Sequence, residues 1–194
     1  MYDIKALYEA ENVQDAIRLL TEHPQAQIIA GGSDVLVQIR EGKRAGVELV
    51  SIYGLDELRG VSLEEDETLR IGSLTSFSHI TKNELIQKYI PVLGEAVDMV
   101  GGPQIRNIGT IGGNTCNGVT SADSASTLFA LDAIIELTGP EGIRRLPIRE
   151  FYIKAGKVDI RQGELQTGIL IPKQSYQGYR GHYIKYAMRN AMDI

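Results

Sequence analysis

The chain has 194 residues, and a composition of 43% hydrophobic and 23% charged residues is typical of a soluble globular protein that can bury a real core. Its formal net charge of −5 argues against nucleic acid or an anionic membrane as a partner, because such binding depends largely on clustered lysine and arginine. The single cysteine, Cys116, excludes an internal disulfide, a CxxC redox pair and a self-contained iron–sulfur site.

The chain shows no targeting or membrane segment. Its N-terminus lacks a basic leader followed by an apolar stretch, and no later run approaches the roughly 20 apolar residues needed for a membrane span. We therefore expect a cytoplasmic protein. Neither an internal repeat nor a Gly/Ser-rich or Pro-rich linker is evident, so the parts of the chain are expected to pack together.

The first 57 residues have the pattern of a small α/β unit. Apolar residues after Asn12 recur at helical spacing, and His23-Pro24 ends that helix. The further elements expected here are a strand over 27–30, a helix that Ser33 or Asp34 caps, and a strand over 48–52.

The pattern changes after residue 58. The acidic run 64–67 is interpreted as a solvated hairpin tip rather than a metal site. Six glycines lie between 101 and 118, which predicts loop-like backbone around a ligand. The regular elements expected are a hairpin of 60–63 with 69–72, a helix from Pro91 that ends at Gly101-Gly102-Pro103, a helix over 121–131, strands over 133–137, 143–147 and 165–171, and a strand over 183–189.

Two Gly-Gly turns are the most informative feature of the chain. They are Ala30-Gly31-Gly32-Ser33-Asp34 and Thr110-Ile111-Gly112-Gly113-Asn114. Glycine lets backbone N–H groups approach an anion closely, and a following helix adds unpaired N–H groups. One such turn is most often a plain turn, but two of them beside hydroxyl and amide donors favour a shared pyrophosphate site. The usual dinucleotide, P-loop and nucleophile-elbow motifs are absent from the sequence.

The other candidate side chains are ambiguous from spacing alone. Asp123, at an expected helix start, fits a helix cap and a ribose contact equally well. Arg106 and Lys185 are candidates for holding an anionic group, although isolated basic residues are usually solvated or ion-paired. The three histidines have no partner at metal-ligand spacing, so no metal site is predicted.

The motifs taken together resemble the FAD-binding subunits of molybdenum hydroxylases, over essentially all 194 residues. The stretches that carry the resemblance are 27–34, 101–107 and 109–114. Within that family, 117–123 and 185–189 are most similar to the separate FAD subunit of xanthine dehydrogenase, with CO-dehydrogenase-type flavoproteins next. The CO-dehydrogenase type has a tyrosine stacked on the flavin where this chain has Ile194, and an aliphatic cover is more like the xanthine type.

The resemblance implies an α+β, two-domain FAD-binding fold of the molybdenum-hydroxylase flavoprotein (PCMH-type) kind. We expect a small N-terminal α/β domain over 1–57, a larger α+β domain with a mostly antiparallel sheet over 58–177, and the start of a truncated C-terminal domain over 178–194. The family continues into a third domain of roughly a hundred residues, a common domain size. One wall of the flavin site is therefore expected to lie outside this chain.

The resemblance also implies a set of FAD-binding residues and no catalytic or metal-binding side chain. The two turns supply backbone contacts to the pyrophosphate, Asp123 lies on the adenosine portion, and Lys185 lies near the flavin end. The full set is Gln27, Ile28, Ile29, Ala30, Gly31, Gly32, Ser33, Asp34, Gly109, Thr110, Ile111, Gly112, Gly113, Asn114, Asp123, Leu165, Ile184 and Lys185.

The function that the resemblance implies is electron transfer in a xanthine-dehydrogenase-like complex. The molybdenum cofactor and 2Fe-2S clusters belong to partner subunits, and electrons pass through FAD on this chain to NAD⁺. The isolated chain is not expected to hydroxylate a purine. Two alternatives stay open: the flavin subunit of another molybdenum hydroxylase, of the CO-dehydrogenase or aromatic-heterocycle type, and a non-redox fragment that binds a nucleotide or a partner.

Overall fold

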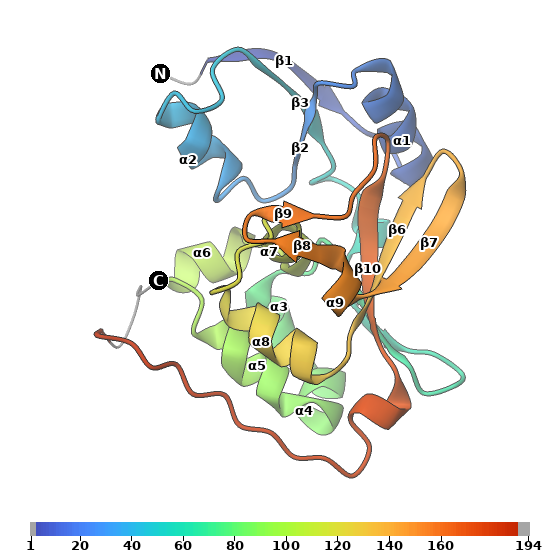
Figure 1. Cartoon of the computed structure of the whole chain (residues 1–194), viewed down its shortest axis with the longest axis vertical. Coiled ribbons are helices and arrows are strands. Elements are labelled where there is room, and N and C mark those ends of the chain that lie inside the picture. The colour runs from blue at the N-terminus through green and yellow to red at the C-terminus, as the bar shows by residue number, and fades with distance from the viewer. Residues whose placement is uncertain (1–2, 190–194) are drawn as a thin grey trace.

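The computed structural model describes residues 3–189 and builds them around two main β-sheets (Figure 1). A three-stranded parallel sheet in the order β1-β3-β2 forms the N-terminal body, drawn in blue to teal. A five-stranded antiparallel sheet in the order β4-β5-β10-β6-β7 forms the second, larger body together with most of the helices. This combination confirms the predicted α+β fold class.

The N-terminal body follows the predicted helix and strand pattern closely. The Asn12 side chain caps α1 by accepting a hydrogen bond from the Asp15 backbone N–H at 2.9 Å, and the helix buries one apolar face. The elements are β1 (Ile4–Glu9), α1 (Val13–Glu22), β2 (Gln27–Ile29), α2 (Val35–Arg40) and β3 (Val47–Ser51). The strand β1 is additional to those expected from the sequence.

The larger body begins after a single 3₁₀ turn (Asp56–Leu58). Its strands are β4 (Val61–Leu63), β5 (Leu69–Gly72), β6 (Ile134–Gly139), β7 (Gly142–Pro147), β8 (Tyr152–Lys154), β9 (Lys157–Val158) and β10 (Leu165–Ile171). Its helices are α3 (Phe77–Lys82), α4 (Glu84–Tyr89), α5 (Pro91–Asp98), α6 (Pro103–Ile108), α7 (Ile111–Cys116), α8 (Asp123–Ala130) and α9 (Ile148–Phe151), with a 3₁₀ turn at Lys173–Ser175. No helix within residues 3–189 is long and apolar enough to cross a membrane.

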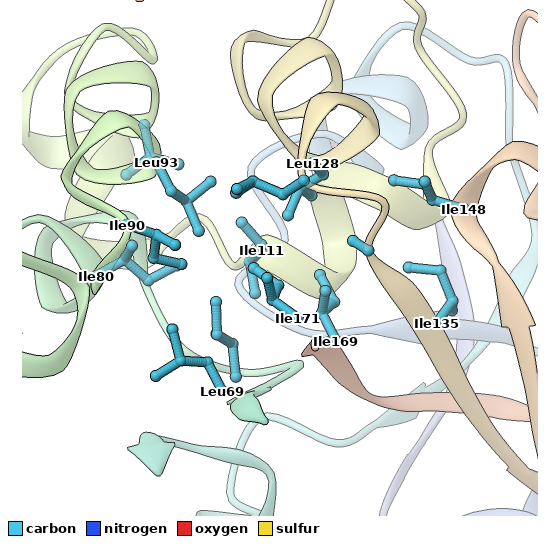
Figure 2. Packing of buried hydrophobic residues seen from close by; sticks show 14 of the residues in the cluster. Leu69, Ile80, Ile90, Leu93, Ile111, Leu128, Ile135, Ile148, Ile169 and Ile171 are labelled. Atoms are coloured by element: carbon cyan, nitrogen blue, oxygen red, sulfur yellow. The ribbon is translucent and has the colours of Figure 1, made fainter. Parts of the chain in front are cut away.

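The main hydrophobic core lies between the antiparallel sheet and the helices. Figure 2 shows side chains from the α3–α5 region and from α8 meeting side chains of β5, β6 and β10. Leu69, Ile111, Leu128, Ile135 and Ile169 are all fully buried there. Since Ile111 belongs to the second Gly-Gly turn, this core fixes the position of that turn.

The other face of the sheet carries a buried carboxylate. Glu136 on β6 lies between Arg70 of β5 and Arg145 of β7, with N–O distances of 2.7 and 2.8 Å. The Thr167 hydroxyl also donates to it at 3.1 Å. Burial raises the pKa of Glu136, but the hydrogen bonds from the two arginines outweigh burial, and the pKa lies below its ordinary value.

The glycine-rich stretch 101–118 is not the continuous loop that its composition predicted. Two six-residue helices, α6 and α7, occupy most of it. Pro103 suits the first turn of α6, and the Thr110 hydroxyl caps α7 by accepting from the Gly113 N–H at 3.1 Å. Packing against the core therefore overrides the low helix propensity of glycine.

The predicted strand over 183–189 is also wrong within the residues that the structure describes. Positions 183–188 have no regular secondary structure. The segment instead bonds to α5 and α8: the Glu95 carboxylate of α5 accepts from the Tyr183 backbone N–H at 3.0 Å, and the Asp123 carboxylate of α8 accepts from the Tyr183 hydroxyl at 2.7 Å. Side-chain bonds to two helices replace the ladder that a neighbouring strand would provide.

Candidate functional site

The two Gly-Gly turns, far apart in the sequence, meet in the structure. The first connects the end of β2 to α2, and the second leads from α6 into α7. A Cβ atom at Gly31 would lie 1.8 Å from the carbonyl oxygen of Ile108, just before the second turn. Glycine is therefore required at position 31, because the two backbones pack directly against each other.

The first turn offers free backbone donors. Gly32 has a φ of +75°, a left-handed conformation that favours glycine. Among the described residues, no protein acceptor receives a hydrogen bond from the backbone N–H groups of residues 31–34. Asp34 begins α2 as predicted, but it does not cap the helix, because its backbone is helical and its carboxylate accepts from the Gln38 amide instead.

The second turn differs, because the N–H groups of residues 111–114 already have partners. The Ile111 and Gly112 N–H groups donate to the backbone oxygens of Thr75 and Ser73, at 3.0 and 2.9 Å. The Gly113 and Asn114 N–H groups donate to the preceding Thr110. These hydrogen bonds hold the second turn rigidly in place. The N–H groups of residues 31–34, in the first turn, are free to bind a ligand.

A cleft of about 710 Å³ lies over both turns and is lined by both bodies of the molecule. This volume is within the ordinary range of cofactor pockets, about 300–1,000 Å³. The lining includes these residues of the predicted set: Gln27, Ile28, Ala30, Gly31, Gly32, Ser33, Asp34, Gly109, Thr110, Gly112, Gly113, Asn114 and Leu165. The fold therefore gathers most of the predicted residues around one cavity.

Five predicted residues lie outside this lining: Ile29, Ile111, Asp123, Ile184 and Lys185. Ile111 is fully buried in the core, and the Ile184 side chain is 77% exposed. The Lys185 Nζ lies 3.0 Å from the Asp123 carboxylate, which also accepts from the Tyr183 hydroxyl at 2.7 Å. Asp123 and Lys185 are thus direct partners in this structure, and their places along the cofactor stay predictions. Ile194 lies outside the described residues.

The cleft also contains polar residues that the sequence did not single out. Gln38 and Arg44 line it beside the first turn, and Arg161 and Gln162 line it from the segment before β10. Arg44 follows Lys43 in the sequence, and no local sequence signal marked it as a cleft residue. The fold alone brings it there, because the loop after α2 returns to the start of β2.

Cys116 lines the cleft as a neutral thiol. Burial raises its pKa to about 12. Its Sγ donates to the Gln166 Oε1 at 3.1 Å, and that oxygen also accepts from the Thr115 hydroxyl at 2.8 Å. A thiol with such a pKa is a poor nucleophile, so Cys116 contributes to the cleft as a neutral packing and hydrogen-bonding group. Within residues 3–189, no group of three or more His, Cys, Asp or Glu side chains could hold a metal ion.

Residues 2–174 match the family described as the FAD binding domain in molybdopterin dehydrogenase. The chain belongs to this family. The xanthine dehydrogenase FAD-binding subunit of Escherichia coli O157:H7 is 42% identical over 194 residues, which is 100% of this chain and 66% of that protein. The chain thus spans slightly less than two thirds of the length of that relative.

Two solved structures share this fold. Reconstituted CO dehydrogenase from Oligotropha carboxidovorans matches with a TM-score of 0.82 and 32% identity, over 86% of this chain and 58% of the other. Quinoline 2-oxidoreductase from Pseudomonas putida 86 matches with a TM-score of 0.89 and 23% identity, over 95% and 64%, and at that identity the likeness concerns the fold alone.

Proposed function

We propose that this chain is the FAD-binding, electron-transferring subunit of a xanthine-dehydrogenase-like molybdenum hydroxylase. The observation that carries the proposal is the 42% identity to a xanthine dehydrogenase FAD-binding subunit over the whole chain. The membership of the FAD-binding family and the cleft over the two turns agree with it.

The residues of the cleft fit FAD. The free N–H groups of residues 31–34 suit the pyrophosphate, because backbone donors bind an anion without needing a lysine. The second turn forms a rigid side of the cleft, because Gly112 packs against Ser73 so closely that a Cβ at position 112 would not fit. Ile28 and Leu165 add apolar surface for the rings. We assign the pyrophosphate contact to 30–34, with 109–114 as the facing wall.

Bound FAD supplies the chemistry that links one-electron carriers to a hydride acceptor. The chain's own residues bind and orient the cofactor, and the buried wall of α7 excludes water from one side of it. We retain Asp123 for the adenosine portion and Lys185 for the flavin end as proposals, and the two side chains are in contact. The role of the exposed Ile184 stays a prediction.

The partners that we propose are a molybdenum-binding subunit and a subunit with 2Fe-2S clusters. Such clusters are usually held by four cysteine thiolates, and the chain has one cysteine. The clusters and the hydroxylation site therefore belong on other chains in this proposal, with NAD⁺ as the electron acceptor and the cytoplasm as the location.

A second candidate is the FAD-binding subunit of a different molybdenum hydroxylase. The 32% identity to CO dehydrogenase from O. carboxidovorans favours considering it. The two candidates share the FAD site and differ in the substrate oxidised on a partner chain. Purification of the native complex and assay with a purine and with CO distinguishes them.

Anaerobic titration with NADH tests the redox role. We expect the purified chain to bind FAD and the visible flavin bands to bleach when NADH is added. Dithionite serves as the control, because it shows that the bound flavin can be reduced. Flavin that dithionite bleaches and NADH leaves unchanged would contradict NAD⁺ as the acceptor, and a chain that binds the nucleotide ADP but not FAD would favour the non-redox alternative.

A further inference from the structure

Arg44 is a positively charged residue of the cleft, and the proposed function does not yet assign it a role. It follows α2 and lines the cavity beside the first turn. Its Nε donates to the Gln38 Oε1 at 2.5 Å, and its Nη1 donates to the Gln27 Oε1. Both acceptors are neutral amides, so they fix the direction of the guanidinium without neutralising its charge.

The charges around the cleft leave Arg44 uncompensated. The charged side chains that line the cavity are Asp34, Arg44 and Arg161. The Arg161 guanidinium has a carboxylate partner, because its Nη1 lies 3.9 Å from the Glu141 Oε2. Among residues 3–189, no carboxylate lies within salt-bridge distance of the Arg44 guanidinium.

One side chain separates Arg44 from the free N–H groups of the first turn. Gln38 accepts from Arg44 through its Oε1 and donates to the Asp34 carboxylate through its Nε2. This chain of two hydrogen bonds holds the Arg44 guanidinium beside the first turn, and it also uses the Asp34 carboxylate as an acceptor. A ligand with two phosphate charges meets repulsion from Asp34, and neutral N–H donors do not cancel that repulsion. A guanidinium with unused N–H donors does cancel it and matches the geometry of phosphate oxygens.

We propose that Arg44 binds the pyrophosphate of the dinucleotide held in the cleft, with Gln27 and Gln38 as positioning residues that aim it. This inference rests on the proposed function, which identifies the dinucleotide as FAD. It adds a charged contact to a site that the sequence pattern describes through backbone donors alone.

Calorimetric titrations of FAD, ADP and riboflavin test this inference. We expect Arg44→Gln to weaken the binding of FAD and ADP by about tenfold or more, the usual effect of losing a charge-assisted contact to phosphate. The affinity for riboflavin, which has no phosphate, should not change. Added salt should weaken FAD binding less in Arg44→Gln than in the wild type, because a screened charge pair is gone. Arg44→Lys should keep part of the affinity.

Lys43→Gln is the matched control, since Lys43 is the preceding residue and is an exposed partner of Glu41 at 2.8 Å. Thermal unfolding of each variant checks that the fold is intact. Unchanged FAD affinity in Arg44→Gln, or an equal loss of riboflavin affinity, would overturn the role of Arg44 while leaving the FAD site standing. A wild-type chain that binds ADP but not FAD would overturn the proposed function, and the ADP titration would still test Arg44. A chain that binds neither would overturn both.

Discussion

Replacement of Gly31 by alanine is expected to abolish high-affinity FAD binding. The new Cβ would lie 1.8 Å from the Ile108 carbonyl oxygen, and the obstacle is backbone, which cannot rotate away as a side chain can. The two turns must therefore separate, and a displacement of about 1 Å in a preorganised site can cost about a hundredfold. We expect a loss of FAD affinity of that order and a destabilisation of about 2–3 kcal/mol, measured by fluorescence titration and urea unfolding.

Gly54→Ala is the control for this experiment. A Cβ at Gly54 meets no atom within 4 Å, and this glycine is not among those with a positive φ. Its unfolding free energy should stay within about 0.5 kcal/mol of the wild type, with unchanged FAD affinity. A folded Gly31→Ala variant that binds FAD as tightly as the wild type would show that contact between the turns is not needed for the site.

Replacement of Glu136 by glutamine should be the most destabilising charge change in the antiparallel sheet. The side chain is 4% exposed and has two arginine partners, so the variant leaves positive charge without its counter-ion. Loss of one partner in a buried ion pair costs about 3–5 kcal/mol, and we expect about 2 kcal/mol here because Arg145 is 54% exposed. Urea unfolding at pH 7 measures this difference.

The same substitution should change the acid sensitivity of the protein. The pKa of folded Glu136 lies below its ordinary value of 4.5, so its contribution to stability is complete above that pH and is lost as the pH falls through the folded-state pKa. The wild type and Glu136→Gln should therefore converge in stability at low pH. Asp132→Asn, which removes an exposed partner of Arg149, is the control and should cost less than about 1 kcal/mol. A pH-independent gap between the wild type and Glu136→Gln would contradict this account.

The regular elements with strong periodicity could be predicted from the sequence. The helix after Asn12 has an amphipathic repeat and a capping residue, and 165–171 ends in three consecutive apolar residues, 169–171, as in a buried central strand. The strand β1 was missed because it lies at a sheet edge with side chains such as Leu7 exposed, which weakens the hydrophobic signal. Helix α7 was missed because its two glycines indicate a loop until the core packing of Ile111 is known.

The candidate site was predictable to the extent that it depends on local backbone chemistry. The two turns could be identified as glycine positions, but the sequence could not show that the N–H groups of residues 111–114 already have protein partners, whereas those of residues 31–34 have none in the described part of the chain. That distinction depends on Ser73 and Thr75, whose carbonyl oxygens satisfy the second turn from a distant segment. Arg44 and the contact between Asp123 and Lys185 likewise depend on tertiary packing.

The crystal structure of the chain with FAD bound tests the central claim most directly. We predict that the pyrophosphate lies against both turns, with its oxygens within hydrogen-bond distance of backbone N–H groups of residues 31–34 and of the Arg44 guanidinium. FAD bound outside the cleft, or a pyrophosphate that does not contact the first turn, would contradict the account.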